Sequence, residues 1–269
     1  YSVIIPCFNE SENLDLLLKS LTKLNIQKDL ETIIVDNGST DNSYRLLSQL
    51  TKEIKINNLK IISIKKNIGY GNGIIRGLNE ASGNFLGWTH ADLQTDVNDL
   101  LKGFKLIEKS TGNNIVKGKR VNRNIFDNIF TIFMSIICTI ILRKTLFDIN
   151  AQPKIFSKSF YSQIKDRAPN DFSLDLYLLY MAKKLHYNIL DFPVFFNKRL
   201  YGEAKGGGSI KTKLLESIKD IFFNRIRLDI FDCSDVQMIN YLDIFKEKKI
   251  GYIYGYTNTI LYFSKFIIK

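Results

Sequence analysis

The chain has 269 residues, and its 38 Lys and Arg against 27 Asp and Glu give a formal net charge of +11. Hydrophobic residues make up 45% and charged residues 24%, a composition that excludes intrinsic disorder, collagen-like repeats and a disulfide-bonded scaffold. The surplus of positive charge predicts an anionic partner: a phosphorylated ligand, an acidic lipid surface or nucleic acid. Three widely separated cysteines, Cys7, Cys138 and Cys233, lack the spacing of a metal site and predict reduced, buried thiols.

Short β-branched segments alternate with amphipathic segments in the first half of the chain. The predicted strands are residues 2–5, 32–35, 60–64 and 85–88. The predicted helices are residues 12–24, 42–50, 70–81 and 97–108, with Ser11 and the 41–43 cluster marking the first two starts. This alternation predicts a parallel sheet with right-handed crossovers. Because Tyr1 opens directly on a core strand, we expect that a longer protein was trimmed upstream.

The second half of the chain is less regular. Its predicted strands are residues 115–117, 153–156 and 188–192, and its predicted helix is residues 172–185. The apolar stretch 125–142, followed by Arg143 and Lys144, fits either a core helix or an interfacial helix on an anionic leaflet. Polar residues interrupt this stretch and the later stretch 250–268, so neither predicts a transmembrane helix.

A glycine-rich, basic loop at 198–208 precedes a predicted amphipathic helix at 210–224. We expect one α/β domain over residues 1–212. Residues 213–269 would form a C-terminal extension, an amphipathic helix and a tail, to which the sequence assigns no role.

Polar and glycine residues follow each of the first four predicted strands, at residues 6–10, 36–41, 67–73 and 89–94. The carboxyl ends of parallel strands meet at one edge of the sheet, and open α/β sheets bind their ligands at that edge. Asp36 at a strand end could accept hydrogen bonds from a base or ribose. The turn with Gly69, Gly71 and Gly73 would let backbone N–H groups approach phosphate oxygens.

Alternate side chains of the segment after the fourth strand, His90, Asp92 and Gln94, lie on one side of an extended turn. Their oxygen and nitrogen atoms suit a divalent cation that bridges a diphosphate. Together with the neighbouring strand ends, they predict a nucleotide diphosphate site.

The ordered motifs IPCFNE, VDNGSTD, NIGYGNGIIRGL and HADLQ resemble those of the family 2 glycosyltransferases of GT-A fold. Within them the chain is most similar to the dolichyl/polyprenyl-phosphate sugar synthase branch, and FNKRLYGEAK resembles that branch's Arg…Gly-Glu-Ser-Lys loop. The resemblance covers roughly residues 1–212. It implies a GT-A, Rossmann-like α/β fold: a mixed, mainly parallel sheet flanked by helices, with a helical C-terminal extension.

The resemblance implies an inverting hexosyltransferase that moves a sugar from a GDP- or UDP-sugar to a polyprenyl (dolichyl or undecaprenyl) phosphate, using Mg²⁺ or Mn²⁺. It would work in the cytoplasm, peripherally at the inner face of an anionic membrane. The implied donor-binding residues are Pro6, Phe8, Glu10, Asp36 and Asp92, together with the glycines of the third motif, Gly69, Gly71 and Gly73. The implied metal ligands are Asp92, Gln94 and, in place of the branch's usual Asp, His90. The implied catalytic residues are Asp92, Arg120, Arg199 and Lys205.

Arg120, Arg199 and Lys205 would receive the acceptor phosphate and offset charge on the leaving diphosphate. A phosphate acceptor is already an anion, so the reaction needs positioning and electrostatic stabilisation and no general base. The chain departs from the branch at Asp127 and Thr131, where an Arg and a Ser are usual, and at residues 148–153, which replace Asp-x-Thr-Ser-Gly.

Two other functions remain open from the sequence. A GT-A enzyme acting on a sugar hydroxyl in capsule or cell-wall assembly would need a general base, for which Asp171 and Asp175 are the candidates. A non-catalytic module could use the same site or the basic surface only to bind a nucleotide or a membrane. Nucleic acid is not an expected partner, because the basic residues are scattered and no recognition module is present.

Overall fold

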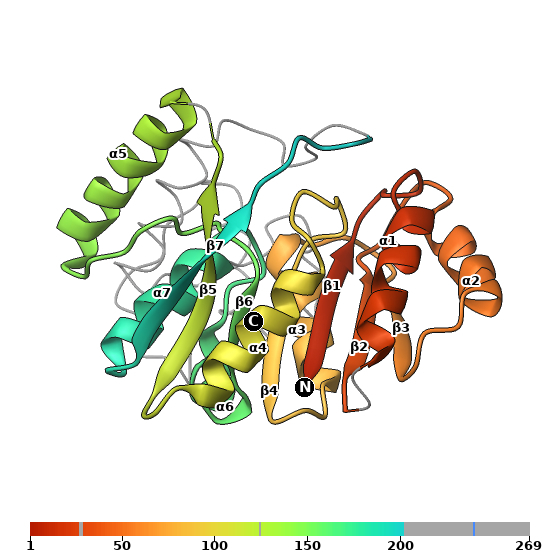
Figure 1. Ribbon diagram of the computed structural model, residues 1–269, viewed down its shortest axis with the longest axis horizontal. Helices are drawn as coiled ribbons and strands as arrows, with labels where there is room; N and C mark the ends of the chain where they lie inside the picture. Colours follow the sequence, from red (N-terminus) through yellow and green to blue (C-terminus); the bar gives the residue numbers. More distant parts are fainter. Residues whose placement is uncertain (27–28, 124, 202–238, 240–269) are drawn as a thin grey trace. The chain divides into compact units, whose positions relative to one another are not determined.

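The computed structural model describes residues 1–26, 29–123, 125–201 and 239 (Figure 1). The chain separates into two compact units, Tyr1–Phe222 and Phe223–Lys269. The fold described below is that of the first unit. The predicted domain boundary at residue 212 and the predicted helix at 210–224 lie outside the described residues, so both stay predictions.

In the described part of the chain, seven strands form one sheet with the order β3-β2-β1-β4-β6-β5-β7 (Figure 1). They are β1 Ser2–Cys7, β2 Glu31–Asp36, β3 Leu59–Ser63, β4 Phe85–Trp88, β5 Asn114–Val121, β6 Lys154–Ser157 and β7 Asn188–Phe195. β1 pairs in parallel with β2 and β4, β2 with β3, and β5 with β7, while β6 runs antiparallel to β4 and β5. The mixed, mainly parallel sheet confirms the predicted fold class.

Helices cover both faces of this sheet. They are α1 Leu14–Leu21, α2 Ser43–Glu53, α3 Tyr70–Glu80, α4 Asn98–Lys109, α5 Ile125–Leu142, α6 Lys158–Ile164 and α7 Leu174–Lys184, with 3₁₀ turns at Thr22–Ile26 and Lys165–Arg167. Among the described residues, no helix is both long enough and apolar enough to cross a membrane.

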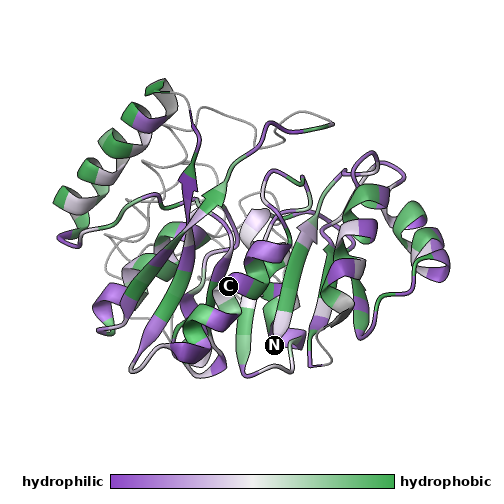
Figure 2. Cartoon of the chain, viewed as in Figure 1, coloured by the Kyte–Doolittle hydropathy of each residue, from purple (hydrophilic) through white to green (hydrophobic). Residues whose placement is uncertain are grey.

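The side chains of the central strands alternate between two hydrophobic cores. Val3 and Ile5 face the core formed with α1 and α4, whereas Ile4 faces the core formed with α3, α6 and α7. Figure 2 shows the apolar strands of the sheet between helices that carry both polar and apolar residues. Cys7 and Cys138 are buried free thiols, as predicted for them, and Cys233 lies outside the described residues.

Two local predictions were wrong. The first helix begins at Leu14 rather than after Ser11, because the Asn13 side chain donates to Glu10 Oε2 at 2.6 Å and the intervening residues form a turn. Helix α6 has no counterpart among the predicted elements. Its seven residues are too few to show a helical repeat, although the Ser157 hydroxyl before it accepts the Phe160 N–H at 3.2 Å as an N-cap.

The strand directions bring six carboxyl ends to one edge of the sheet. β4 and β5 are both antiparallel to β6, so they run in the same direction as each other and as their parallel partners. The segments that follow β1, β2, β4, β5 and β7 therefore meet at one edge, where the fold places ligands.

A single carboxylate at the opposite edge ties four strands together. Glu31, at the start of β2, pairs with Lys60 of β3 at 2.8 Å and accepts the Ser2 hydroxyl of β1 at 2.5 Å. It also accepts the backbone N–H of Ser82, just before β4, at 2.8 Å. Burial by itself would raise the pKa of Glu31, but these hydrogen bonds outweigh it and lower the pKa from 4.5 to about 2.

The substitution Glu31→Gln should reduce the free energy of unfolding at pH 7 by about 1–2 kcal/mol, because it removes a charged acceptor from a partly buried network. A carboxylate whose pKa is lowered in the folded state stabilises that state fully at pH values above its unfolded pKa, near 4.5. This contribution to the free energy of unfolding is lost as the pH falls through the folded pKa of about 2. The difference between wild type and variant in urea denaturation should therefore shrink between pH 5 and pH 2. Glu53→Gln, on the exposed end of α2, is the matched control. A difference that stays constant over this pH range would contradict the prediction.

Candidate active site

The loops after β1 and β2 are bound to each other at the carboxyl edge. The Asn9 side-chain oxygen accepts the Thr40 N–H at 2.7 Å, and the Asn9 N–H donates to the Ser39 hydroxyl at 3.0 Å. The Glu10 N–H donates to the Ser43 hydroxyl at 2.8 Å, at the start of α2. These bonds hold the first two predicted motifs in one fixed arrangement.

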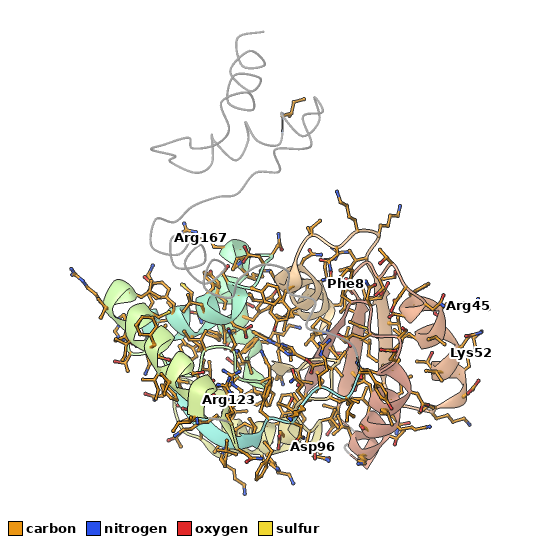
Figure 3. All side chains as sticks on the ribbon, turned by 90° about the horizontal axis from the view of Figure 1, so that it is seen from above. Phe8, Arg45, Lys52, Asp96, Arg123 and Arg167 are labelled. Atoms are coloured by element: carbon orange, nitrogen blue, oxygen red, sulfur yellow. The ribbon has the colours of Figure 1, made fainter. Side chains whose placement is uncertain are left out.

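Within this arrangement lie the residues predicted to hold the nucleoside. Pro6 pairs with Val35 in the sheet, and Phe8, labelled in Figure 3, follows directly and is half-buried. Asp36 ends β2 and is buried, and its carboxylate accepts the Ser39 N–H and the Ser63 hydroxyl, each at 3.3 Å. The structure thus gathers these predicted donor residues on adjacent strand ends.

The centre of the site is an arginine between two buried carboxylates. Nη2 of Arg199, which follows β7, lies 3.1 Å from Glu10 Oε1 and 3.2 Å from Asp92 Oδ2. Glu10 and Asp92 come from the loops after β1 and β4, far apart in the sequence. Both carboxylates thus converge on one positive centre, and the predicted donor residue Glu10 joins the predicted metal ligand Asp92 and the predicted catalytic residue Arg199.

Gln94 connects the loop after β4 to the segment that carries this arginine. Its Nε2 donates to the Asn197 carbonyl at 3.1 Å, and the Asn197 N–H donates back to the Gln94 carbonyl at 2.8 Å. Because Asn197 lies two residues before Arg199, these bonds set the position of the guanidinium. Metal ligation by Gln94 stays a prediction.

His90 contacts an aromatic neighbour through one ring nitrogen and faces Asp92 with the other. Its Nε2 lies 2.8 Å from the Tyr70 hydroxyl, and its Nδ1 lies 3.9 Å from Asp92 Oδ2. Tyr70 in turn stacks on Phe172, with ring centroids 4.8 Å apart. One of the two ring nitrogens of His90 is therefore engaged inside the protein.

The glycine turn packs closely against the loop before α7, and its predicted approach to phosphate stays a prediction. Gly69 has a φ of 141°, and a Cβ there would lie 2.3 Å from the Asn170 carbonyl oxygen. A Cβ on Gly71 would lie 2.4 Å from the carbonyl oxygen of Pro169, and the Asn72 N–H already donates to the Asn170 carbonyl at 2.9 Å. The glycines admit the backbone of the loop before α7, so their residue type is explained by packing.

Arg120, near the end of β5, forms an ion pair with Asp148, in which two guanidinium nitrogens contact one carboxylate oxygen. Its Nε lies 2.8 Å from Asp148 Oδ1, its Nη2 contacts the same oxygen, and its backbone N–H donates to Asp148 Oδ2 at 2.8 Å. The guanidinium also lies over the Phe196 ring, 5.3 Å from its centroid. Burial alone would raise the pKa of Asp148, but the Arg120 hydrogen bonds outweigh it and lower that pKa below its ordinary value.

The two candidate general bases are already engaged. Asp175 is buried, pairs with the fully buried Lys154 and accepts Gln152 Nε2 at 3.0 Å. Asp171, in the turn before α7, accepts the Ser173 N–H at 2.9 Å and the Ser173 hydroxyl. Neither carboxylate is placed as an unengaged base.

Three further positions singled out in the sequence are Lys205, Asp127 and Thr131. Lys205 and the Asp127 side chain lie outside the described residues. Thr131 lies on α5, where its hydroxyl accepts Arg123 Nη1 at 2.6 Å.

The charges at the site favour a divalent cation that arrives together with a diphosphate. Within the described ranges, no cluster of three or more His, Cys, Asp or Glu side chains could hold a metal by itself. Glu10 and Asp92 share the single guanidinium of Arg199, so these three groups carry a net charge of minus one. Mg²⁺ is commonly bound by one or two carboxylates plus substrate phosphates, and Glu10 and Asp92 fit that pattern.

Sequence reasoning missed the partners that hold these residues. Asp148 and Gln152 stood out only as departures from the family pattern, and Tyr70 only as part of a glycine motif. Their contacts join positions 20 to 82 residues apart in the sequence. A covarying pair in related sequences is the signal that could reveal such contacts.

The fold and this carboxyl-edge site define a GT-A glycosyltransferase architecture. Glucosyl-3-phosphoglycerate synthase from Mycobacterium tuberculosis, solved with Mn²⁺, UDP and phosphoglyceric acid, superimposes with a TM-score of 0.62 at 14% identity, covering 81% of this chain and 76% of that one. A mannosyltransferase from Pyrobaculum calidifontis, solved with GDP-Man and Mn²⁺, has a TM-score of 0.60 at 17% identity, covering 84% and 64%. These likenesses show the shared fold.

Residues 2–165, more than half of the chain, match Glycosyl transferase family 2, and the chain belongs to that family. An undecaprenyl-phosphate 4-deoxy-4-formamido-L-arabinose transferase from Proteus mirabilis is 33% identical over 124 residues, 45% of this chain and 37% of that protein. A dolichyl-phosphate beta-glucosyltransferase from Dictyostelium discoideum is 27% identical over 216 residues, 72% of this chain and 65% of that protein. The chain thus spans less than two thirds of the length of these curated relatives.

Arg199 and a divalent cation should compete for the same two carboxylates. We expect Arg199→Gln to lower the melting temperature in the absence of metal, because it leaves Glu10 and Asp92 facing each other uncompensated. Mn²⁺ should then raise the melting temperature of Arg199→Gln more than that of the wild type, as measured by scanning fluorimetry without nucleotide. Lys198→Gln, at the exposed neighbouring position, should respond like the wild type. Equal Mn²⁺ shifts in all three proteins would show that Arg199 does not occupy the cation position.

Proposed function

We propose that the protein is an inverting, metal-dependent glycosyltransferase that moves a sugar, a hexose in the simplest case, from a GDP- or UDP-sugar to a polyprenyl phosphate. The observation that carries this proposal is the convergence of Glu10 and Asp92 on Arg199 at the carboxyl edge of a family 2 sheet. The curated relatives named above are transferases of undecaprenyl-phosphate and dolichyl-phosphate type, which supports the acceptor class.

The donor would lie across the ends of β1, β2 and β4. Asp36, with Pro6 and Phe8 beside it, would hold the nucleoside, since its buried carboxylate can accept hydrogen bonds from a ribose or a base. Asp92, with Glu10 next to it, would hold the metal on the diphosphate. A bound divalent cation would neutralise charge on the leaving diphosphate.

In the proposed reaction an oxygen of the acceptor phosphate attacks the anomeric carbon from the face opposite the diphosphate, so the configuration inverts. The bond from that carbon to the diphosphate oxygen breaks, and its electron pair leaves with the nucleoside diphosphate. No proton has to move. Arg199 would turn from the two carboxylates to phosphate oxygens. Arg120 would face the acceptor phosphate while Asp148 holds its guanidinium. Lys205 would also bind phosphate, as predicted from the sequence.

A phosphate acceptor fits the site better than a sugar hydroxyl does. A hydroxyl acceptor must lose a proton to a base, and the two candidates are engaged elsewhere: Asp175 with the buried Lys154, and Asp171 with Ser173 in the turn before α7. The proposed chemistry makes no use of either carboxylate.

The substitution Asp92→Ala should reduce sugar transfer by more than ~100-fold, because it removes the carboxylate proposed to hold the metal on the donor. The assay combines the protein, Mg²⁺ or Mn²⁺, a panel of nucleotide sugars and undecaprenyl or dolichyl phosphate, and detects the glycolipid by mass spectrometry. Asp96→Ala, in an exposed turn of the same loop, is the matched control and should keep its activity.

Lipid-linked product should form with at least one donor. A wild-type protein that hydrolyses nucleotide sugars but never forms a glycolipid would overturn the acceptor assignment. Full activity of Asp92→Ala would remove that residue from the metal role.

The acceptor's lipid would reach the site from a membrane, and α5 offers a surface for it. The exposed apolar side chains of α5 recur along one stripe: Ile125, Ile129, Ile132, Phe133, Ile136 and Ile140. The opposite stripe packs on the protein through the buried residues Ser135, Cys138 and Leu142. Figure 1 shows α5 at the periphery, beside β5.

Basic residues flank this apolar stripe at both ends. Arg123, labelled in Figure 3, precedes α5, and Arg143 and Lys144 follow it. An apolar stripe between cationic ends is the pattern of a helix that lies in the interface of an anionic leaflet. We therefore place the protein peripherally at the inner, cytoplasmic face of a membrane, with α5 as its contact surface.

Replacing Ile129, Phe133 and Ile136 together by Gln should weaken binding to vesicles that contain anionic phosphatidylglycerol by at least ~10-fold, since each side chain loses apolar burial. Co-sedimentation measures this binding. A double variant with Gln at Leu16 and Tyr44, exposed apolar residues of α1 and α2, is the control and should bind like the wild type. Unchanged binding of the α5 variant would mean that another surface contacts the bilayer.

A further inference from the structure

A chain of polar contacts runs from the buried core to the metal-binding loop. Lys154, fully buried under the Trp88 ring, pairs with Asp175. Asp175 Oδ1 accepts Gln152 Nε2 at 3.0 Å, and the same Nε2 lies 3.4 Å from the Tyr70 hydroxyl. The Tyr70 hydroxyl lies 2.8 Å from His90 Nε2, and the chain of contacts ends beside Asp92.

The buried ion pair fixes the direction of these hydrogen bonds. A carboxylate can only accept, so the Gln152 amide must present its nitrogen to Asp175, even though this leaves Gln152 Oε1 buried without a hydrogen-bond partner. The second N–H of that nitrogen then points to the Tyr70 oxygen. Two acceptors remain for the Tyr70 proton, His90 Nε2 and the Asp175 carboxylate, and the 2.8 Å contact favours His90.

The surroundings of Tyr70 favour keeping this proton on its hydroxyl. Burial raises the pKa of its hydroxyl well above the ordinary value, and the negative charge of Asp175 raises it further. Neutral His90 that accepts a hydrogen bond at Nε2 must carry its own proton on Nδ1, the nitrogen that faces Asp92.

We propose that His90 is a positioning residue that donates from Nδ1–H toward Asp92 and the donor diphosphate, and that it does not ligate the metal. In this tautomer Nε2 has its lone pair engaged by Tyr70, and Nδ1 has no lone pair to offer. His90 then takes the place of an acidic residue by supplying a hydrogen-bond donor. The metal would depend on Asp92, Glu10 and the diphosphate itself. The functional part of this inference rests on the proposed function, but the tautomer does not.

The tautomer can be read directly in the unliganded protein. The sequence contains only two histidines, His90 and the exposed His186, so ¹⁵N-histidine labelling of the untagged chain gives two ring systems, and His186→Gln assigns them. Long-range ¹H–¹⁵N correlation spectra at a pH where imidazole is neutral should show His90 protonated on Nδ1. Tyr70→Phe keeps the ring that stacks on Phe172 but removes the hydroxyl, so it should shift His90 toward the Nε2–H form that free imidazole side chains favour.

A predominantly Nε2–H tautomer of wild-type His90 would overturn the proposal. That result would mean that the Tyr70 hydroxyl turns to Asp175 and leaves Nδ1 free to ligate. If Tyr70→Phe had no effect on the tautomer, the hydrogen-bonded chain would not control His90. Both outcomes are independent of whether the protein transfers a sugar.

A second measurement tests the ligand question with Mn²⁺ and UDP or GDP as probes. Electron spin-echo modulation of the bound Mn²⁺ should lack the strong ¹⁴N coupling of a ligating imidazole and should be the same in wild type and His90→Ala. A ¹⁴N coupling that disappears in His90→Ala would show direct ligation and overturn the proposal. Absence of Mn²⁺ binding with either nucleotide would instead count against the proposed function, while the tautomer result would stand.

Discussion

The attraction between one guanidinium and two buried carboxylates organises the working edge of this protein. Glu10 and Asp92 lie in loops after different strands, and each is less than one tenth exposed. Two carboxylates this close and this buried would repel each other, so both loops can adopt their positions only with a positive charge between them. Arg199 supplies that charge from a third segment, and Gln94 fixes the segment through Asn197. The geometry of the site therefore depends on closing all three loops at once.

The two halves of the sheet differ in whether they bury charged side chains. β1, β2 and β3 pack apolar side chains on both faces, and their polar groups appear only at the strand ends. The half with β5, β6 and β7 buries Lys117 and Lys154, which pair with Asp191 at 3.0 Å and with Asp175 respectively. A buried pair costs desolvation and gives little net stability, but it imposes a direction on its neighbours. Here that direction passes through Gln152 and Tyr70 to the loop after β4.

The sequence predicted the fold well because its signals are local. Uninterrupted β-branched runs predict the strands, and helical repeats predict the helices. Helix α6 was not predicted because it is shorter than two helical turns. Candidate site residues with a motif, such as Asp36 and Asp92, could be predicted for the same reason. The partners of these residues could not, since Asp148 reaches Arg120 only after 28 residues and a helix intervene. The glycine turn shows a different limit: backbone from residues 169–171, far away in the sequence, packs against Gly69 and Gly71, while the predicted approach of this turn to phosphate stays a prediction.

The net charge of +11 has a different meaning in the folded protein than in the sequence. Arg120 and Arg199 were expected to meet phosphates, and the structure pairs Arg120 with Asp148 and Arg199 with both Glu10 and Asp92, which leaves the group of Arg199, Glu10 and Asp92 with a net negative charge. A free diphosphate would be repelled by such an edge, whereas a diphosphate that carries a divalent cation would be attracted. In the proposed reaction, a cation that takes over Asp92 would release Arg199 next to the phosphates that it is proposed to neutralise. Pairing this arginine beforehand would thus withhold positive charge until the metal-bound donor arrives.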